Sequence, residues 1–402
     1  MYEVKGALYG LKTSPKDYQD EVAERLLSLG YKRLTMCSCM YVLVEGDKII
    51  IVYDFVDDFI FTGNDREFVS AKIAEMRCKV STTEPIWDAE NVLGLHLTRD
   101  YERKTISVTM PDRITEMYEK YNVNITREID VPMPTSGYII KDEQFENVSP
   151  EKSSLLDNSG ISDYMGIVGS LIWVSGVRLD VLFTVMYLSW STKSPRVHHM
   201  DMAKYCVAYL YQSRDLPLVL GGSGELQITA YTDASLGTAG KGRSVIGHLV
   251  KLHPDAGAIF ARSTATQTVH LSSFEAELDG LFTALKSVSR VKNILTELGM
   301  AFTQVSNVFS DNKAMIDFVH GAGVAKGVRH MELRMWYVRE KYKCGDVFLD
   351  YCEGVHIPSD KLTKLGSRSS HGKFRVDIMG LRLLADSSRW CKYVHFDNDT
   401  SV

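Results

Sequence analysis

The sequence lacks the long apolar runs of membrane proteins and the paired cysteines of disulfide-stabilised secreted domains. No run without charged residues reaches the roughly 18 residues that a membrane-spanning helix needs. The first residues, MYEVKGALYG, carry an acid early and lack the basic-then-apolar plan of a signal peptide. The seven cysteines are odd in number, scattered, and form no CxxC pair with a matching second half. We therefore expect free thiols in a reducing compartment, no membrane partner and a cytoplasmic location.

A basic excess is also missing. The 46 lysines and arginines against 51 aspartates and glutamates give a net charge of −5. This balance argues against a nucleic-acid partner, because such proteins usually carry excess positive charge. The objection weakens if several acids bind metal ions, because bound cations reverse the local field. The length of 402 residues and the hydrophobic content of 45% suit a soluble protein of two or three domains.

Apolar periodicity predicts four regions along the chain. An α+β unit over 1–111 begins with a helix that ends at Gly30, and continues with strands, a second helix and a strand pair. A helical region over 112–222 contains an irregular stretch at 130–150 and two longer helices near 164–190 and 198–213. A βαβ-rich domain follows over 225–365. The last region, 366–402, is a C-terminal helix with a polar tail.

Four carboxylates in the last 180 or so residues sit where a strand is expected to end or a helix to begin. Asp233 closes LQITAYTD, Glu277 lies in SSFEAEL, Asp311 follows VSNVFS, and Asp360 opens SDKLTK. Like charges that converge on one sheet edge repel each other unless a divalent cation neutralises them. Two such ions, held by acids alone, would suit cleavage of a phosphodiester.

Each acid also has a structural alternative. Asp233 could be a turn residue, and Asp311 could cap the following helix. Asp360 could also be a cap, with Ser359 as a rival.

Glu277 has a competitor two residues away. Ser272 and Glu275 have the S-x-x-E spacing of a capping box, which gives Glu275 a structural role. Glu277 falls near the apolar face of the same helix, where a carboxylate is costly unless it is paired or binds a metal. We therefore favour Glu277 over Glu275 as a ligand.

A second acidic pair, Asp57 and Asp58, interrupts the apolar stretch IIIVYDFVDDFIFTG. Two acids at a hairpin turn are usually only turn residues. The alternative is a second metal-binding cluster.

The motifs in the second half resemble the ribonuclease H domain of copia-type retrotransposon polyproteins. The segments that carry this resemblance are YTDAS at 231–235, SSFEAEL at 272–278, SDNKAM at 310–315, SDKLTK at 359–364 and GRSVIGHLVKL at 242–252. The resemblance implies an α/β domain with a mixed five-stranded sheet and helices on both faces. It also implies that the family's metal-binding acids are Asp233, Glu277, Asp311 and Asp360.

The first half resembles the reverse transcriptase of the same family. ALYGLKTSPKDY at 7–18, FVDD at 55–58, VLGLHL at 92–97 and GIVGSLIWVSGVRLDV at 166–181 carry this resemblance. The chain departs from the family at Thr13, Tyr18, Phe55 and Leu179, where glutamine, tryptophan, tyrosine and proline are usual. The resemblance implies an α+β palm over 1–111, a helical thumb or connection over 112–222, and metal ligation by Asp57 and Asp58.

The resemblance implies hydrolysis of RNA in RNA–DNA hybrids with two Mg²⁺ per site, or Mn²⁺ as an alternative. It also implies binding of primer-template nucleic acid. The third palm acid of this family comes from a strand that precedes the LYGLK segment, at which this chain begins. We therefore expect an incomplete polymerase site unless another Pol segment or a second chain supplies the strand. The alternative is an inactive retroelement remnant that at most binds nucleic acid, and the location could also be a virus-like particle or the nucleus.

Overall fold

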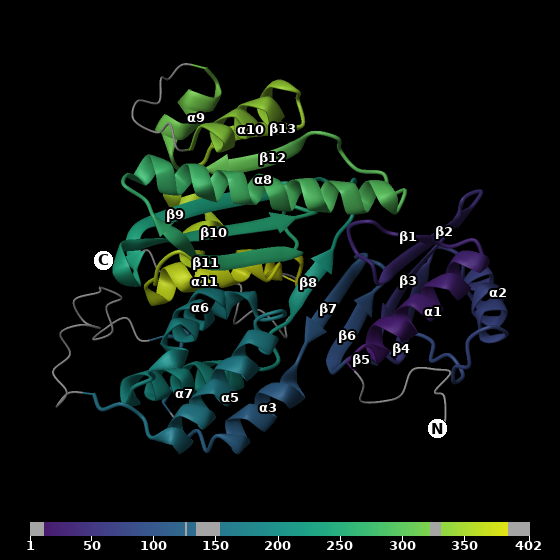
Figure 1. Ribbon diagram of the computed structural model, residues 1–402, viewed down its shortest axis with the longest axis horizontal. Coiled ribbons are helices and arrows are strands. Elements are labelled where there is room, and N and C mark those ends of the chain that lie inside the picture. Colours follow the sequence, from purple (N-terminus) through teal and green to yellow (C-terminus); the bar gives the residue numbers. More distant parts are fainter. Residues whose placement is uncertain (1–11, 125–126, 134–152, 322–330, 385–402) are drawn as a thin grey trace, which may run out of the picture. The chain divides into compact units, whose positions relative to one another are not determined.

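The computed structural model describes residues 12–124, 127–133, 153–321 and 331–384 (Figure 1). Most of the predicted irregular stretch at 130–150, the start of the motif at 7–18 and the tail from 385 lie outside these residues. The chain divides into two compact units: Met1–Asp88 with Arg290–Ala301, and Ala89–Ser289 with Phe302–Val402. Among the described residues, no helix combines the length and the apolar character needed to cross a membrane.

The first unit is an antiparallel sheet in the order β1-β2-β3-β4 with two helices on one face. Asp65 starts the second helix by accepting a hydrogen bond from the Phe68 N–H at 2.8 Å. The φ angle of +89° at Gly30 follows the first helix, as the sequence predicts. The elements are α1 Ser14–Ser28, β1 Lys32–Arg33, β2 Met40–Glu45, β3 Lys48–Phe55, β4 Asp58–Gly63 and α2 Arg66–Arg77.

Strand β3 is apolar on both sides because both sides are covered within the first unit. Ile50 and Val52 pack with α1 and α2. Ile49 and Ile51 pack on the opposite face with Ile294 and other apolar residues of the segment Arg290–Ala301. The nearly continuous apolar run in the sequence therefore reflects two buried faces, as the pattern predicts.

The helical part of the second unit corrects one prediction. The expected single helix near 164–190 is two helices, α5 Asn158–Val174 and α6 Leu182–Trp190, separated by a 3-10 turn. In this turn, the buried Arg178 Nε donates to Asp180 Oδ1 at 2.9 Å. Side chains two positions apart do not face each other on an α-helix, so this buried ion pair requires the break. The other helices of this part are α3 Pro111–Lys120 and α7 Val197–Gln212.

A second four-stranded antiparallel sheet follows the order β5-β6-β7-β8. Its strands are β5 Asn91–Val92, β6 Leu95–Asp100, β7 Thr105–Thr109 and β8 Leu218–Gly221. Thr105 pairs with Gly221, so two segments more than 100 residues apart form one ladder. The compact units therefore do not follow the predicted boundary at residue 111. No local sequence pattern reports such a distant pairing.

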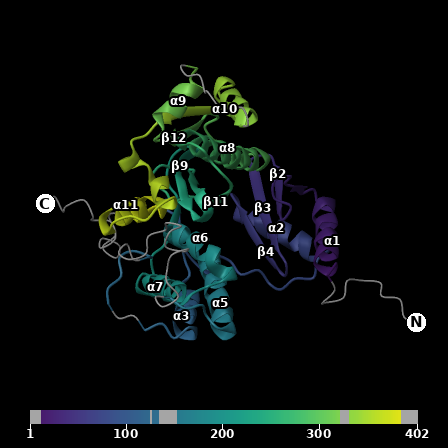
Figure 2. The same cartoon turned by 60° about the vertical axis from the view of Figure 1, so that its left-hand side comes forward.

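The third sheet is mixed, in the order β11-β10-β9-β12-β13. Strands β9 to β11 are antiparallel, and β12 runs parallel to both β9 and β13. The predicted mixed five-stranded sheet is confirmed, and α8 and α11 lie on opposite sides of it (Figure 2). The elements are β9 Thr229–Ala239, β10 Arg243–Lys251, β11 Phe260–Val269, α8 Ser273–Glu297, β12 Ser306–Ser310, α9 Lys313–Val319, α10 Glu332–Lys343, β13 Val347–Tyr351 and α11 Arg368–Ile378.

Helix α11 belongs to the core of this sheet, although the sequence predicts its region, 366–402, as a separate C-terminal part. Phe374 and Ile378 pack with Leu249 of β10. The Lys251 ammonium donates to the Asp377 carbonyl oxygen at 2.9 Å and to Asp377 Oδ1 at 3.0 Å. Lys251 is almost fully buried, so this ion pair anchors the helix to the strand.

Candidate metal-binding active site

Three of the predicted acids meet at one edge of the mixed sheet. Asp233, Glu277 and Asp311 each offer a carboxylate oxygen, and these oxygens lie within 4.8 Å of one another. They come from β9, from the second turn of α8 and from the residue after β12. Among the described residues, this is the one group of three or more such ligands that the structure brings together.

The register of the sheet brings Asp233 and Asp311 together. The last pair between β9 and β12 joins Thr232 to Ser310, so both acids lie one residue beyond it. The sequence predicts that β9 ends at Asp233, and this is wrong. Strand β9 continues to Ala239 because β10 still pairs with it, with Asp233 opposite Gly247. From Asp233 onward, β9 is no longer paired with β12 but is still paired with β10.

The start of α8 separates the roles of its two glutamates. The Glu275 N–H donates to Ser272 Oγ at 3.3 Å, and Glu275 Oε2 accepts from the Leu271 N–H at 2.8 Å. The predicted capping role of Glu275 is confirmed. Glu277, one position beyond Ala276 along the helix, joins the other two acids instead.

Asp311 does not cap the helix that follows it. Asn312 occupies the N-cap position of α9, and its Oδ1 accepts from the Met315 N–H at 3.0 Å. The capping alternative for Asp311 is therefore wrong. Its carboxylate stays available to the acidic cluster.

The three acids are held in an environment that opposes their negative charges. Glu277 is 6% exposed, and its Oε2 has no hydrogen-bond partner among the described residues. Burial, followed by the charges of Asp233 and Asp311, raises the pKa of Glu277 to about 9. Burial raises the pKa of Asp233 to about 6, although the Thr363 hydroxyl opposes this shift. Burial also raises the pKa of Asp311.

These residues fit a divalent cation. A buried carboxylate oxygen without a donor is costly, and a cation can satisfy it. The ligands offered are all carboxylate oxygens, which suit hard cations such as Mg²⁺ or Mn²⁺ and not the thiolate and imidazole preferences of zinc. The donor set therefore agrees with the divalent cation that converging acids predict.

The fourth predicted acid, Asp360, lies near this cluster but is not one of its three members. It belongs to the 3-10 turn η6, Pro358–Leu362, whose N-cap is Ile357 and not Asp360. Asp360 Oδ2 accepts from Lys361 Nζ at 2.7 Å, and Asp360 Oδ1 pairs with Lys364 Nζ. The negative charge of Asp360 contributes to the raised pKa values of the clustered aspartates. Ammonium groups thus occupy both oxygens of this acid.

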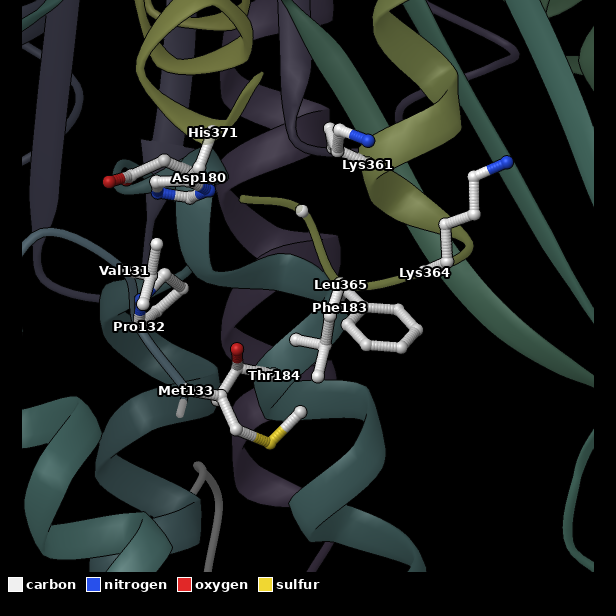
Figure 3. A pocket seen from close by; sticks show the side chains of 11 residues that line it. Val131, Pro132, Met133, Asp180, Phe183, Thr184, Lys361, Lys364, Leu365 and His371 are labelled. Carbon is white, nitrogen blue, oxygen red and sulfur yellow. The ribbon is translucent and has the colours of Figure 1, made fainter. Parts of the chain in front are cut away.

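A small cavity of about 20 Å³ lies beside these lysines. Lys361, Lys364, Thr184 and Asp180 are among its lining residues, and it has room for about one water molecule. The two ammonium nitrogens lie away from Asp180 (Figure 3). The cavity is too small for a nucleotide, and its lining does not include Asp233, Glu277 or Asp311.

The acidic pair of the first unit is arranged differently. Asp57 and Asp58 are exposed at the turn between β3 and β4, where Val56 has a φ of +55°. Asp58 pairs with Phe55 across the hairpin. In the described part of this unit, no third carboxylate joins them to form a cluster of ligands.

Sequence reasoning missed several polar residues around both sites. Asp54 is buried in β3, and burial raises its pKa. The sequence signal that could have identified Asp54 is its position as an acid inside the apolar run KIIIVYDF. Near the acidic cluster, Thr363 and the two lysines lie within the quoted motif SDKLTK, but no role was assigned to them.

The chain is similar both to a known protein family and to individual known proteins. Residues 1–135 match the family described as reverse transcriptase (RNA-dependent DNA polymerase). The retrovirus-related Pol polyprotein from transposon RE1 of Arabidopsis thaliana is 24% identical over 384 residues, which cover 94% of this chain and 25% of the relative. The chain therefore spans about a quarter of the length of that relative.

Two solved structures also align with parts of the chain. LC11-RNase H1, isolated from compost by a metagenomic approach, is 16% identical to this chain. The alignment covers 34% of this chain and 92% of the LC11-RNase H1 chain, with a TM-score of 0.28. The foamy viral protease-reverse transcriptase in complex with RNA/DNA hybrid is 12% identical to this chain. The alignment covers 90% of this chain and 40% of the foamy viral chain, with a TM-score of 0.45.

Proposed function

We propose, from the relationship of this chain to the Pol polyproteins of copia-type retrotransposons, that its second unit hydrolyses the RNA strand of RNA–DNA hybrids with divalent cations. The observation that carries the proposal is the buried Glu277 oxygen without a partner, next to Asp233 and Asp311. A carboxylate in this position is explained by an ion that neutralises it.

Asp233, Glu277 and Asp311 would hold the cations, and Asp360 would complete the ligand set. Two cations, when bound, would supply an activated water and stabilise the oxygen that leaves the phosphodiester. Asp360 could join only by giving up part of its contact with Lys361 and Lys364. The ammonium groups of these two lysines thus lie where a divalent cation is expected to bind.

Glu277 would act as a proton-linked ligand. With a pKa of about 9, it holds a proton at neutral pH in the absence of a cation. A ligand must lose its proton before it can bind, so ion binding at pH 7 would release a proton from Glu277. Asp233, with a pKa of about 6, is largely ionised under the same conditions.

The proposed substrate is an RNA–DNA hybrid, and a primer-template is the related partner of the first unit. Hybrid would be selected by 2′-hydroxyl contacts and by helix shape across the minor groove, with little reading of bases. The negative net charge of the chain does not oppose such binding once several acids hold cations.

DNA synthesis is a less favoured activity for this chain. Asp57 and Asp58 stand exposed, and no third ligand meets them among the described residues. Two-metal chemistry needs a fuller set of carboxylates. A primer-extension assay with Mg²⁺ tests this point, since added nucleotides would require a third acid from elsewhere.

The central experiment compares two aspartate variants of the full chain in Mg²⁺-dependent cleavage of a labelled RNA–DNA hybrid. We expect Asp233→Asn to abolish cleavage, because Asp233 would be a direct metal ligand. Asp317→Asn is the matched control, since Asp317 is exposed on α9 of the same domain and outside the cluster. Undiminished cleavage by Asp233→Asn would overturn the assignment of the acids.

The same assay tests the alternative of an inactive remnant. That alternative predicts no Mg²⁺-dependent cleavage by the unaltered chain. It also predicts that hybrid binding, measured by a mobility shift, is insensitive to the Asp233→Asn change.

A further inference from the structure

The turn η6 and the two residues after it lie directly on β10, next to the acidic cluster. A Cβ atom added at Gly247 would lie 2.6 Å from Leu362 Cβ, 2.9 Å from the Ser359 carbonyl oxygen and 2.9 Å from Thr363 Cγ2. These distances are too short for real contacts, and one of them is to the backbone. Only glycine therefore lets the turn come this close to the strand.

A neighbouring strand fixes the turn in place. Ser263 Oγ of β11 donates to the Leu362 carbonyl oxygen at 2.6 Å. Gly247 pairs with Ser263 on one side and with Asp233 on the other. The turn is thus seated over the strand position that faces Asp233.

This position of the turn over Gly247, which we call the seat, places the Thr363 hydroxyl next to Asp233. Thr363 is fully buried, and its Oγ1 is in hydrogen-bond contact with Asp233 Oδ2. The same oxygen lies 2.9 Å from the Asp360 carbonyl oxygen. A hydroxyl has a single proton, and donation to the ionised carboxylate is the stronger bond because it is charge-assisted.

We infer that Thr363 is a positioning residue, which fixes the Asp233 carboxylate for an incoming divalent cation, and that Gly247 is the seat that makes this possible. The inference rests on the proposed function, because it takes Asp233 as a metal ligand. Thr363 restricts the rotation of the carboxylate by holding one of its two oxygens. The acid is therefore oriented before the ion arrives, and less ordering has to occur on binding.

The expected effect is a loss of metal affinity. Removal of a hydrogen-bond partner of a metal ligand typically lowers affinity about 10- to 100-fold. We therefore expect Thr363→Val, which keeps the shape and removes the hydroxyl, to weaken Mn²⁺ binding by at least about 10-fold. Mn²⁺ binding to the metal-free full chain is measured by calorimetry, with no substrate present.

A matched pair of variants separates the hydroxyl from packing. Thr363→Ser and Thr363→Ala both lose the methyl group and differ only in the hydroxyl. We expect Thr363→Ser to bind Mn²⁺ nearly as the unaltered chain does, and Thr363→Ala to bind as weakly as Thr363→Val. Equal Mn²⁺ affinities for the serine and alanine variants would overturn the inference. This comparison remains decisive even if Thr363→Val does not fold.

Two glycine variants test the seat. Gly247→Ala should weaken Mn²⁺ binding to a similar degree, because the turn must move away from β10. Gly169→Ala is the control, since a Cβ at this exposed site on α5 meets no atom within 4 Å. Gly247→Ala with unchanged Mn²⁺ affinity would show that the seat is not needed.

Failure of the proposed function gives a different result. If the unaltered chain binds no Mn²⁺, or binds it equally after Asp233→Asn, the metal site itself is wrong and the inference falls with it. If the unaltered chain binds Mn²⁺ through Asp233 but all Thr363 variants match it, only the positioning role is wrong.

Discussion

The acids of the two units differ in what surrounds them. Glu277 and Asp233 in the second unit are buried, and burial raises the pKa of each. Asp57 and Asp58 in the first unit lie exposed at a hairpin turn. Solvated acids can remain charged with no partner, whereas buried acids destabilise the fold unless they are neutralised. Burial of converging acids is thus a better sign of an ion site than their number in the sequence.

The strongest test of this difference is the effect of a cation on stability. A ligand at 100 times its Kd adds about 2.7 kcal/mol to the free energy of unfolding. We expect saturating Mg²⁺ to stabilise the second unit by about this amount, and to leave the first unit unchanged. Glu277→Gln should remove most of the stabilisation, because it removes a charged ligand. Scanning calorimetry with and without Mg²⁺ measures both effects.

An equal shift for both units, or one that persists in Glu277→Gln, would contradict the contrast between the two acidic regions. Asp317→Asn serves again as the control for an exposed acid of the same domain.

The pH dependence of stability sharpens the comparison. The pKa of Glu277 rises from 4.5 to about 9 on folding, so between these values the folded chain holds a proton that the unfolded chain releases. The free energy of unfolding of the metal-free protein should therefore fall as pH rises from about 5 to about 9. Asp233, with its pKa raised to about 6, adds to the fall between about pH 4 and 6. Urea unfolding in a chelating buffer measures this slope.

Glu277→Gln cannot titrate at this position, so its stability should vary less between pH 6 and 9 than that of the unaltered chain. Parallel pH profiles for the two proteins would mean that Glu277 is ionised without a metal, and the electrostatic part of the comparison would fail.

The smallest effect is expected in the first unit. Asp57→Asn and Asp58→Asn alter exposed side chains at a turn, so each should change the free energy of unfolding by no more than about 0.5 kcal/mol. Equilibrium unfolding in urea measures this change. A loss well above 1 kcal/mol would reveal a stabilising contact of the hairpin acids and weaken the contrast.

Two kinds of sequence information predicted much of the second unit. The resemblance to the ribonuclease H domain of copia-type polyproteins implied the mixed five-stranded sheet. The local spacing of a capping box distinguished Glu275 from Glu277. The end of β9 was misplaced because an Asp after an apolar run resembles a strand end. The ladder to β10 that carries β9 on to Ala239 is set by tertiary pairing.

Other features could not be predicted because they depend on contacts between distant segments. Strand β8 pairs with β7 across more than 100 residues. The role of Thr363 depends on a turn crossing β10, and the only local sign was Gly247 inside an apolar strand. The break between α5 and α6 places Arg178 and Asp180 against a later segment. Arg178 Nη1 donates to the Ser213 carbonyl oxygen at 2.8 Å, and the Tyr209 hydroxyl donates to Asp180 Oδ2 at 2.6 Å.

The docking of α11 on the mixed sheet has a practical consequence for anyone who wishes to isolate the domain that contains this sheet. A recombinant fragment truncated at residue 365 would keep all four acids but lose Asp377. The Lys251 ammonium, which is 1% exposed, would then be stranded in the interior without its counter-charge. The surface of β10 around Leu249 would also be laid bare to water and prone to aggregate. A soluble fragment that contains the mixed sheet should therefore extend at least through Leu384, which belongs to the same apolar cluster as Leu249 and is the last residue that the structure describes.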